Sequence, residues 1–129
     1  MFDQMRALGA LTNLMKDRQK LTDAAGRIKE RLDSARVEGS AGQGAISVIV
    51  SGSLKVISVH IEPAVAAAFS ADEQSRALAQ DLIAQATNEA MTKAQALARE
   101  TVAEEARELG LPEEVMSHLG GALGPASGL

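Results

Sequence analysis

The chain contains no cysteine, tryptophan or tyrosine, and two phenylalanines among its 129 residues. Without cysteine it has no disulfide framework, thiolate nucleophile or thiolate metal ligand, which favours a reducing, cytoplasmic location. An aromatic content of 2% argues against a surface on which the bases of single-stranded nucleic acid would stack. The sequence shows no run of about 18 apolar residues and no signal-peptide pattern, so we expect no membrane partner.

Signatures of catalysis are also missing. His60 lies in the expected sheet and His118 in the expected tail, and neither histidine has a partner at the ligand spacing of a metal site. The glycines at 42 and 44 lack the third glycine of a dinucleotide-binding loop, and no P-loop lysine follows them. We therefore expect a protein that is not an enzyme, with no catalytic residues, cofactor, metal ion or small-molecule substrate.

The net charge of −4 is unevenly distributed along the chain. Residues 1–36 carry eight basic and five acidic side chains, whereas residues 37–129 carry five basic and twelve acidic ones, so the two parts have net charges of +3 and −7. This difference favours an anionic partner for the first part. A solvated helix surface would produce the same pattern, and the sequence leaves both interpretations open.

The basic part predicts one helix over residues 3–34. Apolar residues recur along it at alternating spacings of three and four, the period of a coiled coil, with one arginine as a polar interruption. Four basic side chains project on the face opposite this apolar seam, within about 60° of one another. The seam consists of Leu11, Leu14, Arg18, Leu21, Ala25, Ile28 and Leu32, and the basic stripe consists of Lys16, Lys20, Arg27 and Arg31.

Residues 35–61 alternate β-branched residues with polar ones and are interrupted by glycines. This pattern predicts three antiparallel strands at 35–39, 45–50 and 54–61, joined by turns in which glycines adopt positive φ. Both faces of the sheet are partly apolar, so more than one layer has to cover it. One face holds Ile46, Val48, Val50, Ile57, Val59 and Ile61, and the other holds Ala45, Ile49, Leu54 and Val56.

A second long helix is predicted over residues 71–109, with Ser70 and Glu73 as its capping box and Gly110 as its end. The acidic pair Glu104 and Glu105 is interpreted as a solvated part of this helix. The last 20 residues hold five glycines and two prolines, so we predict one domain over 1–110 and a flexible tail over 111–129. The apolar stripe of the helix consists of Ala79, Ile83, Ala86, Ala90, Ala94 and Leu97.

The length of the second helix predicts a homodimer. At 1.5 Å per residue it would be about 58 Å long, whereas a compact chain of this size has a radius of gyration of about 14 Å. The helix therefore protrudes, and a second copy has to cover both its apolar stripe and the second face of the sheet. We place this dimer interface at Ile49, Leu54 and Val56.

The sheet region resembles the YbaB/EbfC family of bacterial nucleoid-associated proteins. The matching runs are GQGAISVIVSG at residues 42–52, VHIEP at 59–63 and NLMK at 13–16. The family often has asparagine where this chain has Ser51, and aspartate where it has Glu62. Both replacements are conservative for a turn and for a strand end.

The resemblance implies an α+β fold with the order α-β-β-β-α, a tweezers-like homodimer, and a place in the cytoplasm at the nucleoid. It also implies binding to double-stranded DNA with little sequence preference, with an influence on nucleoid organisation and gene expression. Because phosphate contacts give affinity without sequence information, we take the basic first helix as the DNA-binding element and expect the acidic second helix to face away from the duplex. The candidate DNA-binding residues are Lys16, Lys20, Arg27 and Arg31, followed by Arg6, Arg18 and Lys29.

A homodimeric adaptor is the alternative. Such a protein would use the same arms to hold another protein and would bind DNA weakly or not at all. The dependence of duplex binding on salt distinguishes the two hypotheses.

Overall fold

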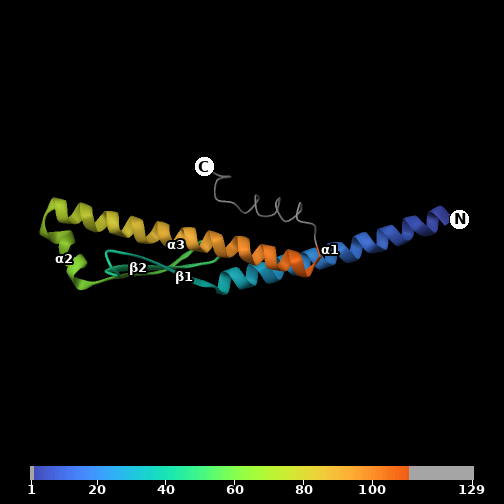
Figure 1. The fold of residues 1–129 in the computed structure, drawn as a ribbon, viewed down its shortest axis with the longest axis horizontal. Coiled ribbons are helices and arrows are strands. Elements are labelled where there is room, and N and C mark those ends of the chain that lie inside the picture. Colours follow the sequence, from blue (N-terminus) through green and yellow to red (C-terminus); the bar gives the residue numbers. More distant parts are fainter. Residues whose placement is uncertain (1, 111–129) are drawn as a thin grey trace.

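The computed structural model describes residues 2–110, and their side chains from residue 16 onward. The elements are α1 (Phe2–Ser34), β1 (Arg36–Ala41), β2 (Ile46–Ser51), β3 (Val56–Ile61), α2 (Pro63–Ala71) and α3 (Glu73–Glu108). The helix α3 runs along the sheet, α2 reverses the chain at one end, and α1 leaves the sheet at the other (Figure 1). This arrangement confirms the predicted α+β architecture. The tail predicted over 111–129 lies outside the described residues.

The sheet has the strand order β1-β2-β3, and both pairs are antiparallel. Val48 of β2 lies opposite Gly39 on one side and Val59 on the other. A bulge between Ile49 and Val50 shifts the register, so that Val50 pairs with Val56. The predicted hairpin is therefore present, but its third strand begins at Val56 rather than at residue 54.

The core lies between one face of the sheet and α3. Ile46, Val48 and Val50 are fully buried against the small side chains of Ala86, Ala90 and Ala94. Small residues on α3 allow its backbone to approach the sheet, and a stripe of this kind is what the sequence predicts. The predicted stripe of α3 is present, with Ala79 also buried and Ile83 and Leu97 partly buried. The expectation that a second copy covers this stripe was wrong, because the sheet of the same chain packs against it.

Gly39 in β1 makes the closest approach between the sheet and α3. A Cβ atom at this position would lie 2.3 Å from the carbonyl oxygen of Ala86 and 2.3 Å from the backbone nitrogen of Ala90. Both neighbours are backbone atoms, which cannot rotate away as a flexible side chain can. Glycine is therefore required here for space rather than for an unusual φ.

The two turns of the sheet differ from each other. In the β1–β2 turn, Gly42 and Gly44 have φ of 63° and 89°, as predicted. In the β2–β3 turn, the residue with positive φ is Leu54, at 67°, and not Gly52. The absence of a side chain at Gly52 instead leaves room for α1, because a Cβ atom there would lie 3.0 Å from the carbonyl oxygen of Leu32.

The start of α3 differs from the predicted capping box. Asp72 is the N-cap, and its Oδ1 accepts a 2.7 Å hydrogen bond from the backbone N–H of Ser75. The Ser70 hydroxyl donates instead to the carbonyl of Ala67, because Ser70 belongs to the last turn of α2. The prediction was wrong because Asp72 lies nearer to the first turn of α3, and aspartate satisfies the first N–H groups of a helix as well as serine does.

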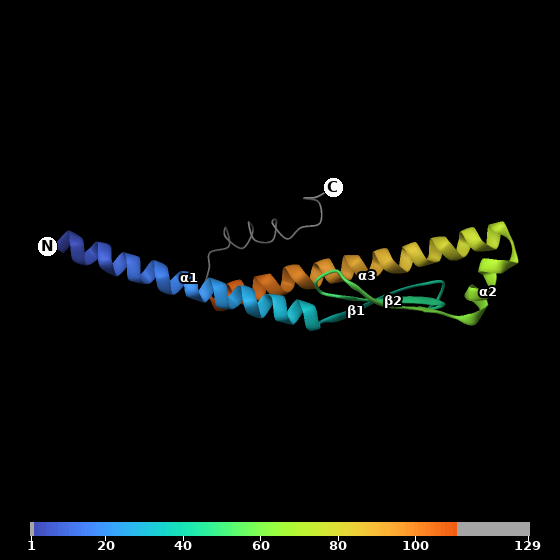
Figure 2. The same ribbon diagram turned by 180° about the vertical axis from the view of Figure 1, so that it is seen from behind.

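The molecule is extended. At 1.5 Å per residue the 36 residues of α3 measure about 54 Å, whereas strands of six residues measure about 20 Å. The helix α3 therefore continues past the sheet, where its C-terminal part lies beside α1, and α1 projects farther still (Figure 2). The predicted protrusion of α3 is present, with α1 as its neighbour along the protruding part.

Candidate nucleic-acid interface

The face of α1 that packs against α3 is centred on Ala24, which is 3% exposed. Ala25 is exposed, and Leu21 of the predicted seam is 47% exposed, whereas Ile28 and Leu32 are partly buried. The helix α1 is thus rotated so that α3 lies at the edge of the predicted apolar seam and not along its centre. Part of the seam stays open to solvent in the single chain.

Because of this rotation, Arg27 and Arg31 are directed toward α3. The Nε of Arg27 donates to Oε2 of Glu105 at 3.1 Å, and Nη1 of Arg31 reaches the other carboxylate oxygen of Glu105 at 3.4 Å. Nη2 of Arg31 donates to Oε2 of Glu104 at 2.7 Å. Two arginines of one helix and two glutamates of the other therefore form one cluster, which we call the Arg–Glu cluster.

The two glutamates of this cluster differ in exposure. The side chain of Glu105 is 5% exposed, whereas those of Glu104 and Arg31 are 42% and 46% exposed. A buried carboxylate needs hydrogen-bonded cationic partners, which explains why both arginines turn toward Glu105. The interpretation of Glu105 as solvated was wrong. So was the placement of Arg27 and Arg31 away from the packing face of α1.

The Arg–Glu cluster also affects ionisation. The hydrogen bond from Arg31 to Glu104 raises the pKa of Arg31 above its ordinary value, and the negative charges of Glu104 and Glu105 act in the same direction. The guanidinium is charged, as arginine side chains are throughout the pH range in which proteins fold. We call the projecting α1 the arm, and the part of it that lies beside α3 the base of the arm. Because the cluster pairs two positive with two negative groups, it contributes no net charge to this base.

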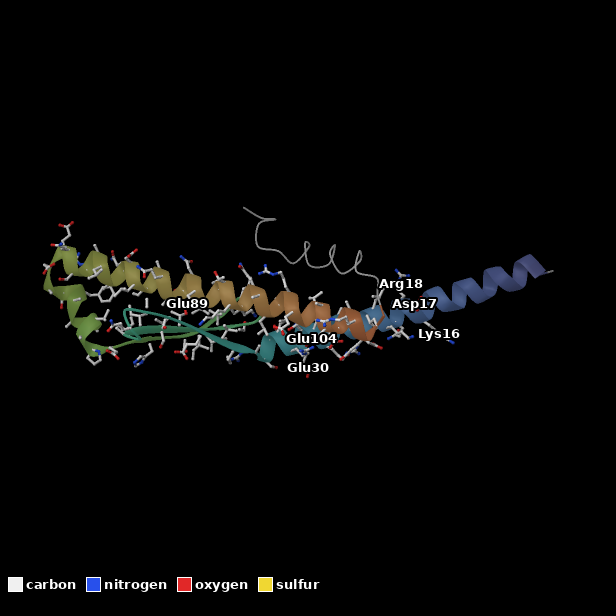
Figure 3. The ribbon with its side chains drawn as sticks, viewed as in Figure 1. Lys16, Asp17, Arg18, Glu30, Glu89 and Glu104 are labelled. Atoms are coloured by element: carbon white, nitrogen blue, oxygen red, sulfur yellow. The ribbon has the colours of Figure 1, made fainter. Side chains whose placement is uncertain are left out.

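Three predicted DNA-binding residues lie nearer to the N-terminus of α1 than the Arg–Glu cluster and are not part of it. Lys16, Arg18 and Lys20 are exposed, and they form no ion pair with another residue from 16 to 110. Lys16 and Arg18 lie where α1 extends past the end of α3, and their side chains point to opposite sides of the helix (Figure 3). This part of the arm offers cations to a partner on more than one side.

The two remaining predicted DNA-binding residues are Lys29 and Arg6. Lys29 is exposed and forms an ion pair with Asp33 at 3.0 Å, one turn along the same helix. This contact, together with a hydrogen bond from Ser53, lowers the pKa of the Asp33 carboxyl. Arg6 belongs to α1, but its side chain lies outside the described residues.

The charge of α3 does not favour the binding of a polyanion such as DNA. Its sequence carries seven acidic and four basic side chains. The basic residues Arg99 and Arg107 are exposed but lie among Glu100, Glu104 and Glu108. Outside the Arg–Glu cluster, α3 carries five acidic and four basic side chains, so it offers no excess of positive charge to a polyanion.

A second surface of note is the outer strand β3. The helix α3 covers β1 and β2, and the whole of β3 up to His60 is exposed. Val56, Ile57 and Val59 are 47–49% exposed, and Leu54 in the preceding turn is 43% exposed. Of the predicted interface residues, Leu54 and Val56 belong to this apolar edge, whereas Ile49 is partly buried in the neighbouring strand.

Over the described residues, no helix is both long enough and apolar enough to cross a membrane. The same part of the chain brings no three histidine, cysteine, aspartate or glutamate side chains together in a way that could hold a metal ion. The basic surface of α1 and the apolar edge at β3 are exposed features that suit a partner.

Comparison with known proteins gives a family whose description is the YbaB/EbfC DNA-binding family, and it matches residues 8–109. A nucleoid-associated protein of Alkaliphilus metalliredigens is 39% identical over 94 residues, which are 73% of this chain and 78% of the relative. A nucleoid-associated protein of Pelotomaculum thermopropionicum is 34% identical over 87 residues, covering 67% and 78%. One of Bacillus cytotoxicus is 32% identical over 105 residues, covering 81% and 92%.

Proposed function

Because the chain belongs to the YbaB/EbfC DNA-binding family, we propose that it binds double-stranded DNA at the nucleoid as a homodimer, through phosphate contacts and with little sequence preference. The resemblance found in the sheet region is thereby confirmed. The family is one of DNA-binding proteins rather than of enzymes, which agrees with the expectation that this chain is not an enzyme.

The observation that supports this function most strongly is the projecting part of α1. Lys16 and Arg18 lie there, and Lys20 follows one turn later; all three are exposed and form no ion pair with a residue from 16 to 110. Unpaired lysine and arginine side chains neutralise phosphates and release counterions, which gives affinity for any duplex sequence. With 2% aromatic residues, stacking on unpaired bases contributes little.

The apolar edge at β3 supports the homodimer. An edge strand with exposed apolar residues is a template for association with another chain. Leu54 adds to this argument because it is exposed while its φ of 67° is unfavourable for a residue with a side chain, a combination that occurs at functional positions. Association of two copies at β3 would bury this edge and give the assembly two basic arms.

The experiment is the binding of the purified protein to fluorescent duplexes of unrelated sequence over a range of salt concentrations. If three cations of each protomer contact phosphate, the dimer neutralises about six phosphates, and log K falls with log salt at a slope of roughly −5. Similar affinities for unrelated duplexes would support backbone recognition. A strong preference for one duplex would contradict it.

The adaptor hypothesis makes a different prediction for the same experiment. The exposed Leu21 and Ala25 of α1 provide an apolar surface on the arm that suits a protein partner as well as a second copy. An adaptor without a DNA role gives no binding at about 50 mM salt, where phosphate contacts are strongest. Folded dimer that fails to bind under this condition would replace our proposal with the adaptor.

A further inference from the structure

From the Arg–Glu cluster we infer that Glu104 acts as an internal competitor of DNA phosphate: its carboxylate occupies Arg31 and thereby weakens the binding of the duplex. This inference rests on the proposed function and concerns its regulation. It assigns to the acidic helix α3 a role in lowering the affinity of the basic helix α1 for DNA.

The geometry makes Arg31 the residue for which two anions compete. Arg31 shares one stripe of α1 with Lys16 and Lys20, because residues 16, 20 and 31 project within about 60° on a helical wheel. Its Nη2 donates to Oε2 of Glu104 at 2.7 Å. A phosphate oxygen prefers the same planar N–H groups, so the carboxylate occupies a donor that a duplex lying along the stripe would use.

Glu104 and Glu105 differ in the solvent exposure of their side chains. Glu105 is buried and holds both Arg27 and Arg31, so its contacts keep the helices together. The pair of Glu104 and Arg31 is nearly half exposed on both sides, and exposed ion pairs of this kind are weak and screened by salt. A phosphate can therefore displace Glu104 from Arg31 without unfolding the arm.

Removal of the Glu104 charge tests the inference. Glu104→Gln keeps an oxygen that can accept from Arg31, and Glu105 still holds the arginine. We expect this variant to bind a random duplex about 3- to 10-fold more tightly at about 100 mM salt. Its slope of log K against log salt should be steeper by nearly 2, because one additional phosphate is neutralised by each protomer.

The matched control is Glu100→Gln, which removes the same charge from an exposed position of α3 one turn before Glu104. Glu100 forms no ion pair with a residue from 16 to 110, so we expect it to have less than half the effect of Glu104→Gln. In an Arg31→Gln background the Glu104 substitution should lose its effect. Dimer mass and melting temperature verify that the fold is kept.

Several results would overturn the inference. Glu104→Gln could bind as the wild type or the Glu100 control does, or its gain could persist without Arg31. Weaker binding would show that Glu104 positions Arg31 for phosphate instead of competing with it. If the wild type binds duplex and one of these results is found, the proposed function stands and the inference alone fails. If neither wild type nor Glu104→Gln binds any duplex, both fail.

Discussion

The Nε of Arg27 in α1 donates a 3.1 Å hydrogen bond to Oε2 of Glu105 in α3, across 78 residues of sequence. Glu105 is buried at this contact and Arg27 is half exposed. The pair fixes α1 beside α3 where the two helices lie next to each other. Among the described side chains of α1, Ala24 is the one that is buried there. The direction of the basic arm therefore depends on an ion pair as well as on apolar packing.

Arg27→Gln is expected to destabilise the protein by about 1–2 kcal/mol. Loss of one partner from a buried ion pair typically has an effect of about 3–5 kcal/mol, and it is smaller here because Arg27 is half exposed and Arg31 remains as a second partner of Glu105. Urea denaturation measures the difference. The control Lys29→Gln, which breaks an exposed pair within α1, should change stability by less than 0.5 kcal/mol or so. Equal effects of the two substitutions would contradict the role of Arg27.

The core and the sheet could be predicted from the sequence, because they depend on local periodicity. Alternation in residues 46–50 predicts which side chains share one face of the sheet, and the alanine stripe predicts which face of α3 is buried. That these two faces pack against each other within one chain was not predicted. The rotation of α1 could not be predicted, because Ala24 and Ala25 are identical side chains at adjacent positions, one beside the apolar seam and one within it.

The Arg–Glu cluster could not be predicted for a related reason. Which residues of α1 lie beside Glu105 depends on how far α3 extends past the sheet, and no pattern in the sequence records this distance. The one available signal was the spacing of Arg27 and Arg31, four residues apart on one helix face, opposite an adjacent pair of glutamates on another helix. That signal identifies partners only once the two helices are known to be neighbours.

Gly39→Ala is expected to destabilise the fold by about 3 kcal/mol, at the upper end of the range for overpacking. Its Cβ would lie 2.3 Å from two backbone atoms of α3, so the sheet and the helix would have to separate. Gly26→Ala is the matched control, because a Cβ at this helical position would lie within 4 Å of nothing beyond the nearby backbone and neighbouring residues of its own helix. It should stabilise the protein by about 0.5–1 kcal/mol. Melting curves that moved in the same direction would show that the close approach at Gly39 is absent.

Val56→Asp is expected to dissociate the proposed dimer, because it places a charge in the middle of the apolar edge at β3. Leu54→Asp should act in the same way. Leu78→Asp is the control, since Leu78 is 62% exposed on α3 and lies outside this edge. Sedimentation should give twice the 13.4 kDa of one chain for the wild type and the control, and less for the β3 variants. Dimers that persist with unchanged melting in both β3 variants would place the interface elsewhere.

The pH dependence of stability is expected to involve Asp72. Hydrogen bonds from the backbone and side chain of Ser75 lower the pKa of the Asp72 carboxyl, so its contribution is present above the ordinary carboxyl pKa of about 4 and is lost as pH falls through the lower, folded value. Asp72→Asn keeps an N-cap oxygen but does not titrate. Its melting temperature should therefore fall less steeply than that of the wild type between about pH 5 and pH 2. Parallel curves for the two proteins would exclude this contribution.

The salt dependence of duplex binding by two charge-reversed variants tests the central claim most directly. In one variant, Lys16 and Lys20 of α1 are replaced by glutamate, and in the other Arg99 and Arg107 of α3 are replaced in the same way. If α1 carries the phosphate contacts, the first variant binds every duplex more weakly, and its slope is smaller by about 4, because four contacts are lost from a dimer. The second variant should keep a slope near that of the wild type. Equal losses in the two variants, or an unchanged slope in the first, would contradict the assignment of DNA binding to α1.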